Sequence, residues 1–286
     1  MTILVFGKTG QVATELATLP GTLCLGRDIA NLNDPAACAA AIIANAPVAV
    51  INAAAYTAVD RAEGDEASAL TINGTAPGVM AQTCAQLGIP LVQISTDYVF
   101  NGSGDTPWHP DAPTAPLGAY GRTKLAGEQA VQAEEGTYAI LRTSWVVSAY
   151  SANFVKTMLR LGGAHDTLDI VADQIGGPTG AREIAAACHN IATQLVDQPI
   201  KTGIYHFAGA PDCSWAGFAR AIISKAGLAC TVRDIPSSAY LTPAVRPLNS
   251  RLDCTNLYTT FGIPRPDWKD TLTHILTELG HLNDRA

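Results

Sequence analysis

The sequence predicts an α/β protein with a doubly wound parallel sheet and a second, smaller lobe of mixed α/β structure. Three observations predict this fold class. Short apolar segments without polar alternation recur along the first half of the chain, as in strands that are buried on both faces. They alternate with segments of helical character, which is typical of βαβ units. A glycine-rich turn separates the first strand from the first helix.

Five strands and four helices are expected in the first half of the chain. The strands are residues 2–6, 22–25, 48–51, 91–95 and 138–142. The helices are residues 11–19, 36–46, 66–87 and about 120–134. Asp34 is suited to cap the second helix, and Pro35 is suited to its first position. The polar segment 101–117 is long for a connection, and its length indicates a functional loop.

The second half is less regular, and five prolines between residues 236 and 266 interrupt it. Helices are expected at residues 151–161, 181–196, 214–226 and 268–280, and strands at 168–171, 203–207 and 230–235. We expect a dinucleotide-binding domain at residues 1–147 and a mainly substrate-binding lobe at 148–286. The two are expected to be interleaved, with segments in about 168–208 returning to the first domain.

The composition excludes several classes of protein. The 286 residues are 48% hydrophobic and 15% charged, which is typical of a packed chain rather than a disordered one. The net charge is −7 and no basic run occurs, so a nucleic-acid partner is not expected. No signal peptide or membrane-spanning run is seen, and the seven scattered cysteines suit a reducing compartment. The expected location is the cytoplasm.

The glycine-rich turn predicts a dinucleotide site. Gly7 allows the tight turn, and Gly10 lets the backbone approach a pyrophosphate at the start of the following helix. Ala13 replaces the third glycine and is small enough for close packing of helix on sheet. An ordinary strand–helix turn is the alternative, but the position at the start of a doubly wound pattern favours the dinucleotide.

The end of the second strand is the expected selector between NADPH and NADH. Arg27 could meet a 2′-phosphate, whereas Asp28 could bind a free 2′-hydroxyl group. We predict NADPH through Arg27, with NADH as the alternative. Asn31 and Leu32 are expected to flank the adenine, unless this segment is simply a solvated loop.

Tyr120 and Lys124 lie four residues apart on an expected helix and so share one face. If this face borders a nicotinamide, the lysine is expected to lower the pKa of the phenol, so that Tyr120 can exchange a proton near neutral pH. The alternative is an exposed helix with a lysine whose stem covers apolar surface.

Several motifs extend this pattern along the whole chain. They are Gly7-Lys8-Thr9-Gly10-Gln11-Val12, residues 52–60 (NAAAYTAVD), residues 95–100 (STDYVF), Tyr120-Gly121-Arg122-Thr123-Lys124, residues 142–145 (RTSW), 173–179 (DQIGGPT) and 246–252 (RPLNSRL). In this order they resemble the extended short-chain dehydrogenases/reductases, most closely the dTDP-4-dehydrorhamnose reductase family.

The resemblance implies an NAD(P)H-dependent reduction of the 4-keto group of a dTDP-linked 4-keto-6-deoxy sugar, dTDP-4-dehydro-β-L-rhamnose, to dTDP-L-rhamnose, the last step of dTDP-rhamnose synthesis for cell-surface polysaccharide. Thr96 would bind the keto oxygen, Tyr120 would protonate it, and Lys124 would hold the nicotinamide ribose. The resemblance places further residues at the cofactor and at the sugar. Those at the cofactor are Thr9, Gln11, Val12, Ala53, Ala54 and Tyr56, and those at the sugar are Val59, Asp97, Tyr98 and Trp145.

Two features separate this chain from its relatives. Nucleotide-sugar 4,6-dehydratases carry a glutamate after the Thr-Asp pair, and Tyr98 here removes that acid–base partner of water elimination. Some members of the family bind Mg²⁺ between two subunits through glutamates. Glu15 and Glu278 match two of these positions, but Arg182 stands at the third, so no metal site is expected here. The chain is expected to be a monomer or a homodimer.

Alternatives remain open at this point. Arg246 is a candidate clamp for the substrate diphosphate, with an interdomain salt bridge as the other interpretation. For the whole protein, the alternatives are a non-catalytic NAD(P)-binding regulatory subunit and a reductase or epimerase for another nucleotide sugar.

Overall fold

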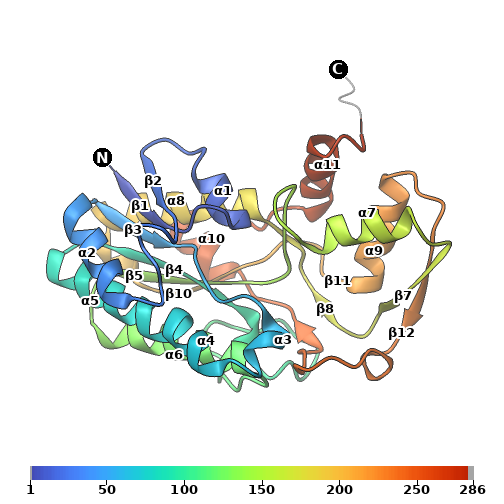
Figure 1. The fold of residues 1–286 in the computed structure, drawn as a ribbon, viewed down its shortest axis with the longest axis horizontal. Helices are drawn as coiled ribbons and strands as arrows, with labels where there is room; N and C mark the ends of the chain where they lie inside the picture. The colour runs from blue at the N-terminus through green and yellow to red at the C-terminus, as the bar shows by residue number, and fades with distance from the viewer. Residues whose placement is uncertain (1, 283–286) are drawn as a thin grey trace.

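The computed structural model describes residues 2–282, and its centre is a six-stranded sheet in the order β10-β5-β4-β3-β1-β2 (Figure 1). All neighbouring strands of this sheet are parallel. The predicted fold class is therefore confirmed. The strands are β1 (Ile3–Phe6), β2 (Thr22–Leu25), β3 (Ala49–Asn52), β4 (Leu91–Thr96), β5 (Tyr138–Thr143) and β10 (Gly203–Phe207).

Helices cover both faces of this sheet, which explains why its inner strands are almost continuously apolar. A separate hydrophobic cluster lies between the sheet and the helices on each face. One face carries α1 (Gln11–Leu16), α8 (Ala181–Asp197) and α10 (Thr255–Phe261), and the other carries α2 (Pro35–Asn45), α5 (Ala76–Leu87) and α6 (Ala119–Ala133) (Figure 1).

The strand order places a topological switch between β1 and β3. The chain leaves β1 for β2 on one side and then returns to β3 on the other side of β1. In open parallel sheets, ligands bind beside the carboxyl ends of the strands at such a point. Gly7 follows β1 and Ala53 follows β3, so the glycine turn and the third-strand motif meet there.

The second lobe lies beside the sheet (Figure 1). It has its own hydrophobic cluster. Its helices are α7 (Phe154–Gly162), α9 (Trp215–Lys225) and α11 (Trp268–Glu278), and its longer strands are β7 (Thr167–Val171) and β12 (Thr231–Ile235). Short strands join the parts: β6 (Val146–Val147), β8 (Ile175–Gly176), β9 (Thr179–Gly180), β11 (Cys213–Ser214) and β13 (Asn249–Ser250). β7 pairs with β12 in the second lobe. In contrast, β10 is a strand of the central sheet and α8 packs against that sheet.

The expected helix over residues 66–87 is confirmed in its bounds, but it contains a π-helical turn that was not predicted. The structure has α4 (Glu66–Leu70), a π-helical turn at Thr71–Thr75, and then α5, which ends at Gly88 in the left-handed conformation (φ +66°). The periodic apolar pattern does not reveal the one-residue slip of a π turn. The short helix α3 (Val59–Ala62) and helix α10 were also missed. The Asp34 cap is confirmed, since its side chain accepts a hydrogen bond from the Ala37 amide.

The long loop 101–117 is bound to the C-terminal part of the chain. The Trp108 amide donates to the Arg251 carbonyl at 2.9 Å, and the Trp108 indole donates to the Asn249 carbonyl at 3.1 Å. Its ring stacks on Phe100 with centroids 4.7 Å apart. Residues 249–253 are thereby held against the end of β4.

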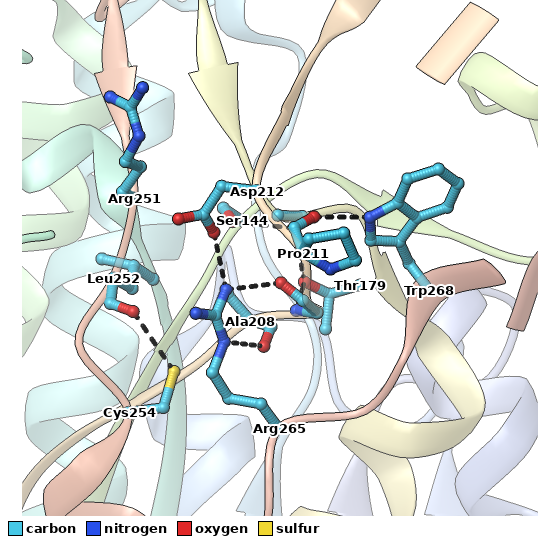
Figure 2. A network of polar contacts seen from close by, with 12 residues as sticks. Ser144, Thr179, Ala208, Pro211, Asp212, Arg251, Leu252, Cys254, Arg265 and Trp268 are labelled. Atoms are coloured by element: carbon cyan, nitrogen blue, oxygen red, sulfur yellow. Dashed lines mark hydrogen bonds and ion pairs between the residues drawn. The ribbon is translucent and has the colours of Figure 1, made fainter. Parts of the chain in front are cut away.

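A second polar network fixes the connection between β10 and β11 (Figure 2). The Arg265 guanidinium donates to the carbonyls of Ala208 and Gly209 and to the Asp212 carboxylate. The Trp268 indole donates to the Pro211 carbonyl at 2.6 Å. This network joins the start of α11 to the edge of the central sheet. Among residues 2–282, no helix combines the length and the apolar character that crossing a bilayer requires.

Candidate active site

A cavity of about 960 Å³ lies at the carboxyl ends of the strands. It is lined by the segments that follow β1 to β5, by the start of α6, and by Phe154 and Trp215 from the second lobe. Every residue predicted to bind cofactor or substrate lines this cavity, apart from Arg246. Residues from distant parts of the chain are thus brought into one space, and their roles in it stay predictions.

The glycine turn has the geometry that a dinucleotide needs. Gly7 has φ +118°, and a Cβ atom there would lie 3.1 Å from the Cβ atom of Ala13, so only glycine fits without strain. A Cβ atom on Gly10 would meet no atom within 4 Å and would project into open space. The open side of Gly10 leaves room for a diphosphate against the backbone, and the residues therefore fit a dinucleotide.

Residues 148–153 hold the glycine turn from the other side. The Ser148 hydroxyl donates to Gln11 Oε1 at 2.7 Å, and Asn153 Nδ2 donates to the same atom at 3.1 Å. The Ser151 hydroxyl donates to the Thr9 carbonyl at 3.1 Å. The side chain of Gln11 therefore binds residues 148–153, and Gln11 also lines the cavity beside Val12.

The end of β2 forms the part of the cavity that suits an adenosine. Leu32 is buried and Asn31 is partly buried, so they can form a wall for an adenine ring. Arg27 and Asp28 are exposed at its rim. Among residues 2–282, Arg27 takes part in none of the ion pairs, so its guanidinium is available to a phosphate there.

The segment after β3 is fixed by Asn73, a buried residue of the π-helical turn. The Tyr56 amide donates to Asn73 Oδ1 at 2.8 Å, and Asn73 Nδ2 donates to the Tyr56 carbonyl at 3.1 Å and to the Thr123 hydroxyl at 3.2 Å. The turn thus ties the loop with Ala53, Ala54 and Tyr56 to α6. A π turn inside a helix is frequent at functional sites.

Thr96, Tyr120 and Lys124 all line the cavity. Thr96 ends β4, and the two others lie one turn apart on α6. Gly121 allows α6 to approach the loop after β4, because a Cβ atom there would lie 2.2 Å from the Tyr98 carbonyl oxygen. The Tyr98 ring meets the Tyr120 ring edge to face, with centroids 5.6 Å apart. These contacts hold the phenol in one place.

The expected lowering of the Tyr120 pKa by Lys124 is wrong. Burial raises the pKa of Tyr120 to about 12, and a hydrogen bond between Tyr120 and Thr96 acts in the opposite direction. The Lys124 ammonium instead donates to the Ile94 carbonyl at 2.6 Å, and burial lowers the pKa of Lys124 to about 8. Tyr120 is therefore a neutral phenol at pH 7, which is the form that gives a proton to a substrate.

Asp97 lies beside this group as a buried carboxyl. Its Oδ1 accepts from the Thr96 hydroxyl at 3.2 Å, and its Oδ2 is buried without a partner among the described residues. Burial raises the pKa of Asp97 to about 7, against a hydrogen bond from Ser250. A carboxyl with an unpaired oxygen in a cavity is suited to accept or donate a hydrogen bond to a hydroxyl group of a ligand.

Three aromatic rings that contact one another also line the cavity, and two of them were not predicted. Trp145, which has a left-handed backbone (φ +49°), stacks on Trp215 with centroids 3.6 Å apart. Phe154 packs on Trp215 at 4.5 Å. Phe154 and Trp215 come from the irregular second half, where no motif marks them. Their aromatic character and their place at helix starts were the only available signals.

Arg246 forms the interdomain salt bridge that was the alternative to a phosphate clamp. Its two terminal nitrogens donate to Asp60 Oδ1 at 3.0 Å and Oδ2 at 2.8 Å. The Ala244 amide donates to the same carboxylate. Asp60 belongs to α3 and adjoins Val59, which lines the cavity. The segment before β13 is thus fastened to the first domain beside the expected sugar site.

The carboxylates considered for a metal, Glu15 on α1 and Glu278 on α11, do not line the cavity. Burial and the neighbouring Glu278 raise the pKa of Glu15, and Arg182 opposes them. Glu278 accepts a hydrogen bond from the Tyr150 hydroxyl at 2.5 Å. Within residues 2–282, no group of histidine, cysteine and acidic side chains has the arrangement of a metal site. The expectation of no metal stays a prediction.

The parallel sheet, the glycine turn and the Thr-Tyr-Lys group together define an oxidoreductase of the short-chain dehydrogenase/reductase type, which works with a nicotinamide cofactor. Comparison with known proteins narrows this class. The family model described as RmlD substrate binding domain matches residues 1–281. The dTDP-4-dehydrorhamnose reductase of Burkholderia thailandensis is 44% identical over 94% of this chain and 96% of its own.

Solved structures agree with this result. The dTDP-4-dehydrorhamnose reductase of Clostridium acetobutylicum is 34% identical, covers 98% of this chain and 100% of its own, and superposes with a TM-score of 0.91. That of Bacillus anthracis, solved in complex with NADP, is 31% identical, covers 97% and 100%, and has a TM-score of 0.89. The chain therefore belongs to the RmlD substrate binding domain family, the family of the dTDP-4-dehydrorhamnose reductases.

Proposed function

We propose that the protein reduces the 4-keto group of dTDP-4-dehydro-β-L-rhamnose with NADPH to give dTDP-L-rhamnose. The observation that carries the proposal is the group of Thr96, Tyr120 and Lys124 in the cavity beside the glycine turn. The relatives named for this activity support the choice of substrate. Sugar nucleotides and reduced nicotinamides are both supplied in the cytoplasm, which is the location that we propose.

The geometry suits addition of a hydride and a proton across a carbonyl group. When bound, the dihydronicotinamide supplies the hydride. Charge then develops on the keto oxygen, and hydroxyl groups held in place stabilise it better than water does. Tyr120 gives its phenolic proton to this oxygen, and Thr96 donates a second hydrogen bond. The Lys124 ammonium stabilises the resulting phenolate and binds the ribose hydroxyl groups.

Tyr98 restricts the chemistry to reduction. Elimination of water from the neighbouring carbon needs an acid and a base close to the sugar, and Tyr98 occupies the place of one of them. Burial raises the pKa of Tyr98 above its ordinary value, so this phenol stays neutral. We propose that Tyr98, Asp97, Val59 and Trp145 contact the sugar.

Arg27 is proposed as the selector for NADPH. Its free guanidinium at the rim can form charge-assisted hydrogen bonds to a 2′-phosphate. We expect Arg27→Ala to lower kcat/KM for NADPH about tenfold to a hundredfold, which corresponds to the loss of one or two such bonds. The value for NADH should stay close to that of the wild type. Arg160→Ala, an exposed site on α7 outside the cavity, is the control. An equal loss with both cofactors would remove Arg27 as the selector.

The function is tested by an assay of purified protein with the 4-keto sugar nucleotide, following NADPH absorbance. We expect oxidation of NADPH in equal amount to the dTDP-L-rhamnose formed. Tight binding of NADPH without turnover would instead favour the regulatory subunit. Turnover of another 4-keto nucleotide sugar in preference to this one would assign a different substrate.

A further inference from the structure

A buried ion pair lies directly behind the proposed catalytic group. Glu128 is on α6, one turn beyond Lys124, and Arg142 is on β5. Arg142 Nη2 donates to Glu128 Oε2 at 2.6 Å, and Arg142 Nε donates to Oε1 at 2.9 Å. Only 1% of Glu128 and 2% of Arg142 is exposed. The proposed reaction uses neither side chain directly.

Each partner of Glu128 adjoins a residue of the cavity. The Ser95 hydroxyl donates to Glu128 Oε1 at 2.5 Å, and Ser95 precedes Thr96 on β4. Arg142 precedes Thr143, and it stands opposite Ser95 in the register of β4 and β5. Lys124 binds the carbonyl of Ile94, the residue before Ser95. Glu128 and Lys124 therefore fasten α6 to two consecutive residues of β4.

The other contacts of Arg142 complete the enclosure of this pair. Its Nη1 donates to the Pro110 carbonyl at 3.0 Å and lies 3.4 Å from His206 Nε2. Its guanidinium also lies 5.0 Å from the centre of the Phe100 ring. A buried ion pair of this kind is often no more stabilising than apolar residues of the same volume. Its charge therefore calls for a role beyond stability.

We propose that Glu128 is a positioning residue for Lys124: its carboxylate holds α6 against β4 through Ser95 and keeps the ammonium of Lys124, which lines the cavity, in its charged form. The role rests on the proposed function of Lys124. Burial lowers the pKa of Lys124, and the negative charge of Glu128 is the influence that raises it. Without that charge, Lys124 would lose its proton closer to neutral pH and could no longer stabilise a phenolate at Tyr120.

Other groups around Lys124 do not substitute for Glu128. Arg142 is positive and would act in the opposite direction once Glu128 is removed. His206 is neutral at assay pH, because burial and Arg142 lower its pKa to about 3. The remaining titratable or charged groups lie on α6 itself, on the helices and strands packed against it, or between α3 and α4: Asp60, Arg61, Glu63, Asp65, Glu66, Cys84, Asp97, Tyr98, Tyr120, Arg122 and Tyr138.

The test compares Glu128→Gln with a matched control. Glu66→Gln also removes one carboxylate that pairs with an arginine, but its Arg122 partner is exposed. Arg122 also lies two residues from Lys124 on α6, so the two side chains leave different faces of the helix. We expect kcat of the wild type to fall at high pH as Lys124 loses its proton. In Glu128→Gln this fall should occur about one pH unit lower, whereas Glu66→Gln should keep the wild-type profile. Glu128→Asp, which retains the charge, should restore the profile even if the protein is less stable.

A second measurement does not depend on turnover. The Kd of NADPH can be measured by fluorescence at a series of pH values. Because Lys124 binds the ribose, the Kd should rise as the pH is raised and Lys124 loses its proton. In Glu128→Gln this rise should begin at a lower pH than in the wild type. This reading holds even if the 4-keto sugar proves not to be the substrate. If Glu128→Gln does not fold, the variant Glu128→Gln/Arg142→Gln leaves no unpaired buried charge. It should show a shift in the same direction, but a smaller one, because the opposing positive charge of Arg142 is removed as well. An unchanged pH dependence of both kcat and Kd would overturn the proposal.

Discussion

At the scale of single residues, the site depends on how burial changes acids. Tyr120 and Asp97 both line the cavity, and burial raises the pKa of each, which shifts both toward their neutral forms. Burial disfavours the charged form of any acid unless a partner compensates it. For reduction this is useful, because the phenol must carry its proton when the substrate arrives. The pH behaviour of the protein should therefore reflect these residues.

Tyr120→Phe should retain NADPH binding and lose about 10²-fold to 10⁴-fold in kcat, the usual contribution of a positioned proton donor. The phenyl ring keeps the edge-to-face contact with Tyr98, so the fold should be unaffected. Single-turnover kinetics and a cofactor titration check both statements. Tyr138→Phe, on β5 and outside the cavity, should behave like the wild type. Near wild-type turnover by Tyr120→Phe would show that another group supplies the proton.

Asp97 should make the protein less stable as the pH rises. Its pKa is about 7 in the folded protein and about 3.9 in an unfolded chain, so only the folded state holds the proton between these values. The free energy of unfolding therefore falls from about pH 4 to pH 7, by about 1.4 kcal/mol per pKa unit at most.

Asp97→Asn removes this titration and should be more stable than the wild type at pH 8, but not near pH 4. Urea unfolding at both pH values measures the difference. Asp105→Asn, in the exposed part of loop 101–117, serves as the control and should leave the pH dependence as it is. An identical pH dependence in the wild type and Asp97→Asn would show that Asp97 is charged in the folded protein.

At the scale of elements, local signals predicted what local residues determine. Gly7, Gly10 and Ala13 predicted the turn, because the residues that allow φ > 0 and close packing lie within one short segment of the chain. The Asp34 cap was predictable from the sequence for the same reason. The π-helical turn was not predictable in this way, because Asn73 is fixed by Tyr56 and Thr123, which lie 17 and 50 residues away. Its apolar pattern resembles that of an ordinary helix.

Asn73→Ala should lower the free energy of unfolding by about 1–3 kcal/mol, because the Tyr56 amide and carbonyl would lose their partners in a buried place. The loop at Ala53 and Ala54 should also loosen, which raises the Kd of NADPH. Chemical denaturation and a cofactor titration measure the two effects. Thr71→Ala removes an exposed hydroxyl from the same π turn and should change neither. A stable Asn73→Ala variant with unchanged Kd would mean that the turn has no role at the cofactor.

At the scale of the whole molecule, motifs predicted the sheet and the cavity better than the contacts between the lobes. Eighteen of the nineteen predicted site residues line one cavity. Each of them either lies at the end of a strand of the central sheet or in the segment that follows it, or faces the cavity from α6. Trp215 and Phe154 belong to a lobe that has no regular period, and their position depends on contacts with Trp145 that only the folded chain brings together. Arg246 was recognised as a candidate, but its partner could not be identified from the sequence.

The Asp60–Arg246 pair favours the salt-bridge interpretation of Arg246 over the phosphate clamp, and a double-mutant cycle tests it. Both terminal nitrogens of Arg246 bind Asp60, so we expect a bridge that closes the segment before β13 over the cavity. Asp60→Asn, Arg246→Gln and the double variant should then raise KM for the sugar nucleotide by similar factors. The pair is partly exposed, so its effect on stability should stay within about 1 kcal/mol. A phosphate clamp would behave differently: Arg246→Gln would raise KM, whereas Asp60→Asn would free the guanidinium and lower it.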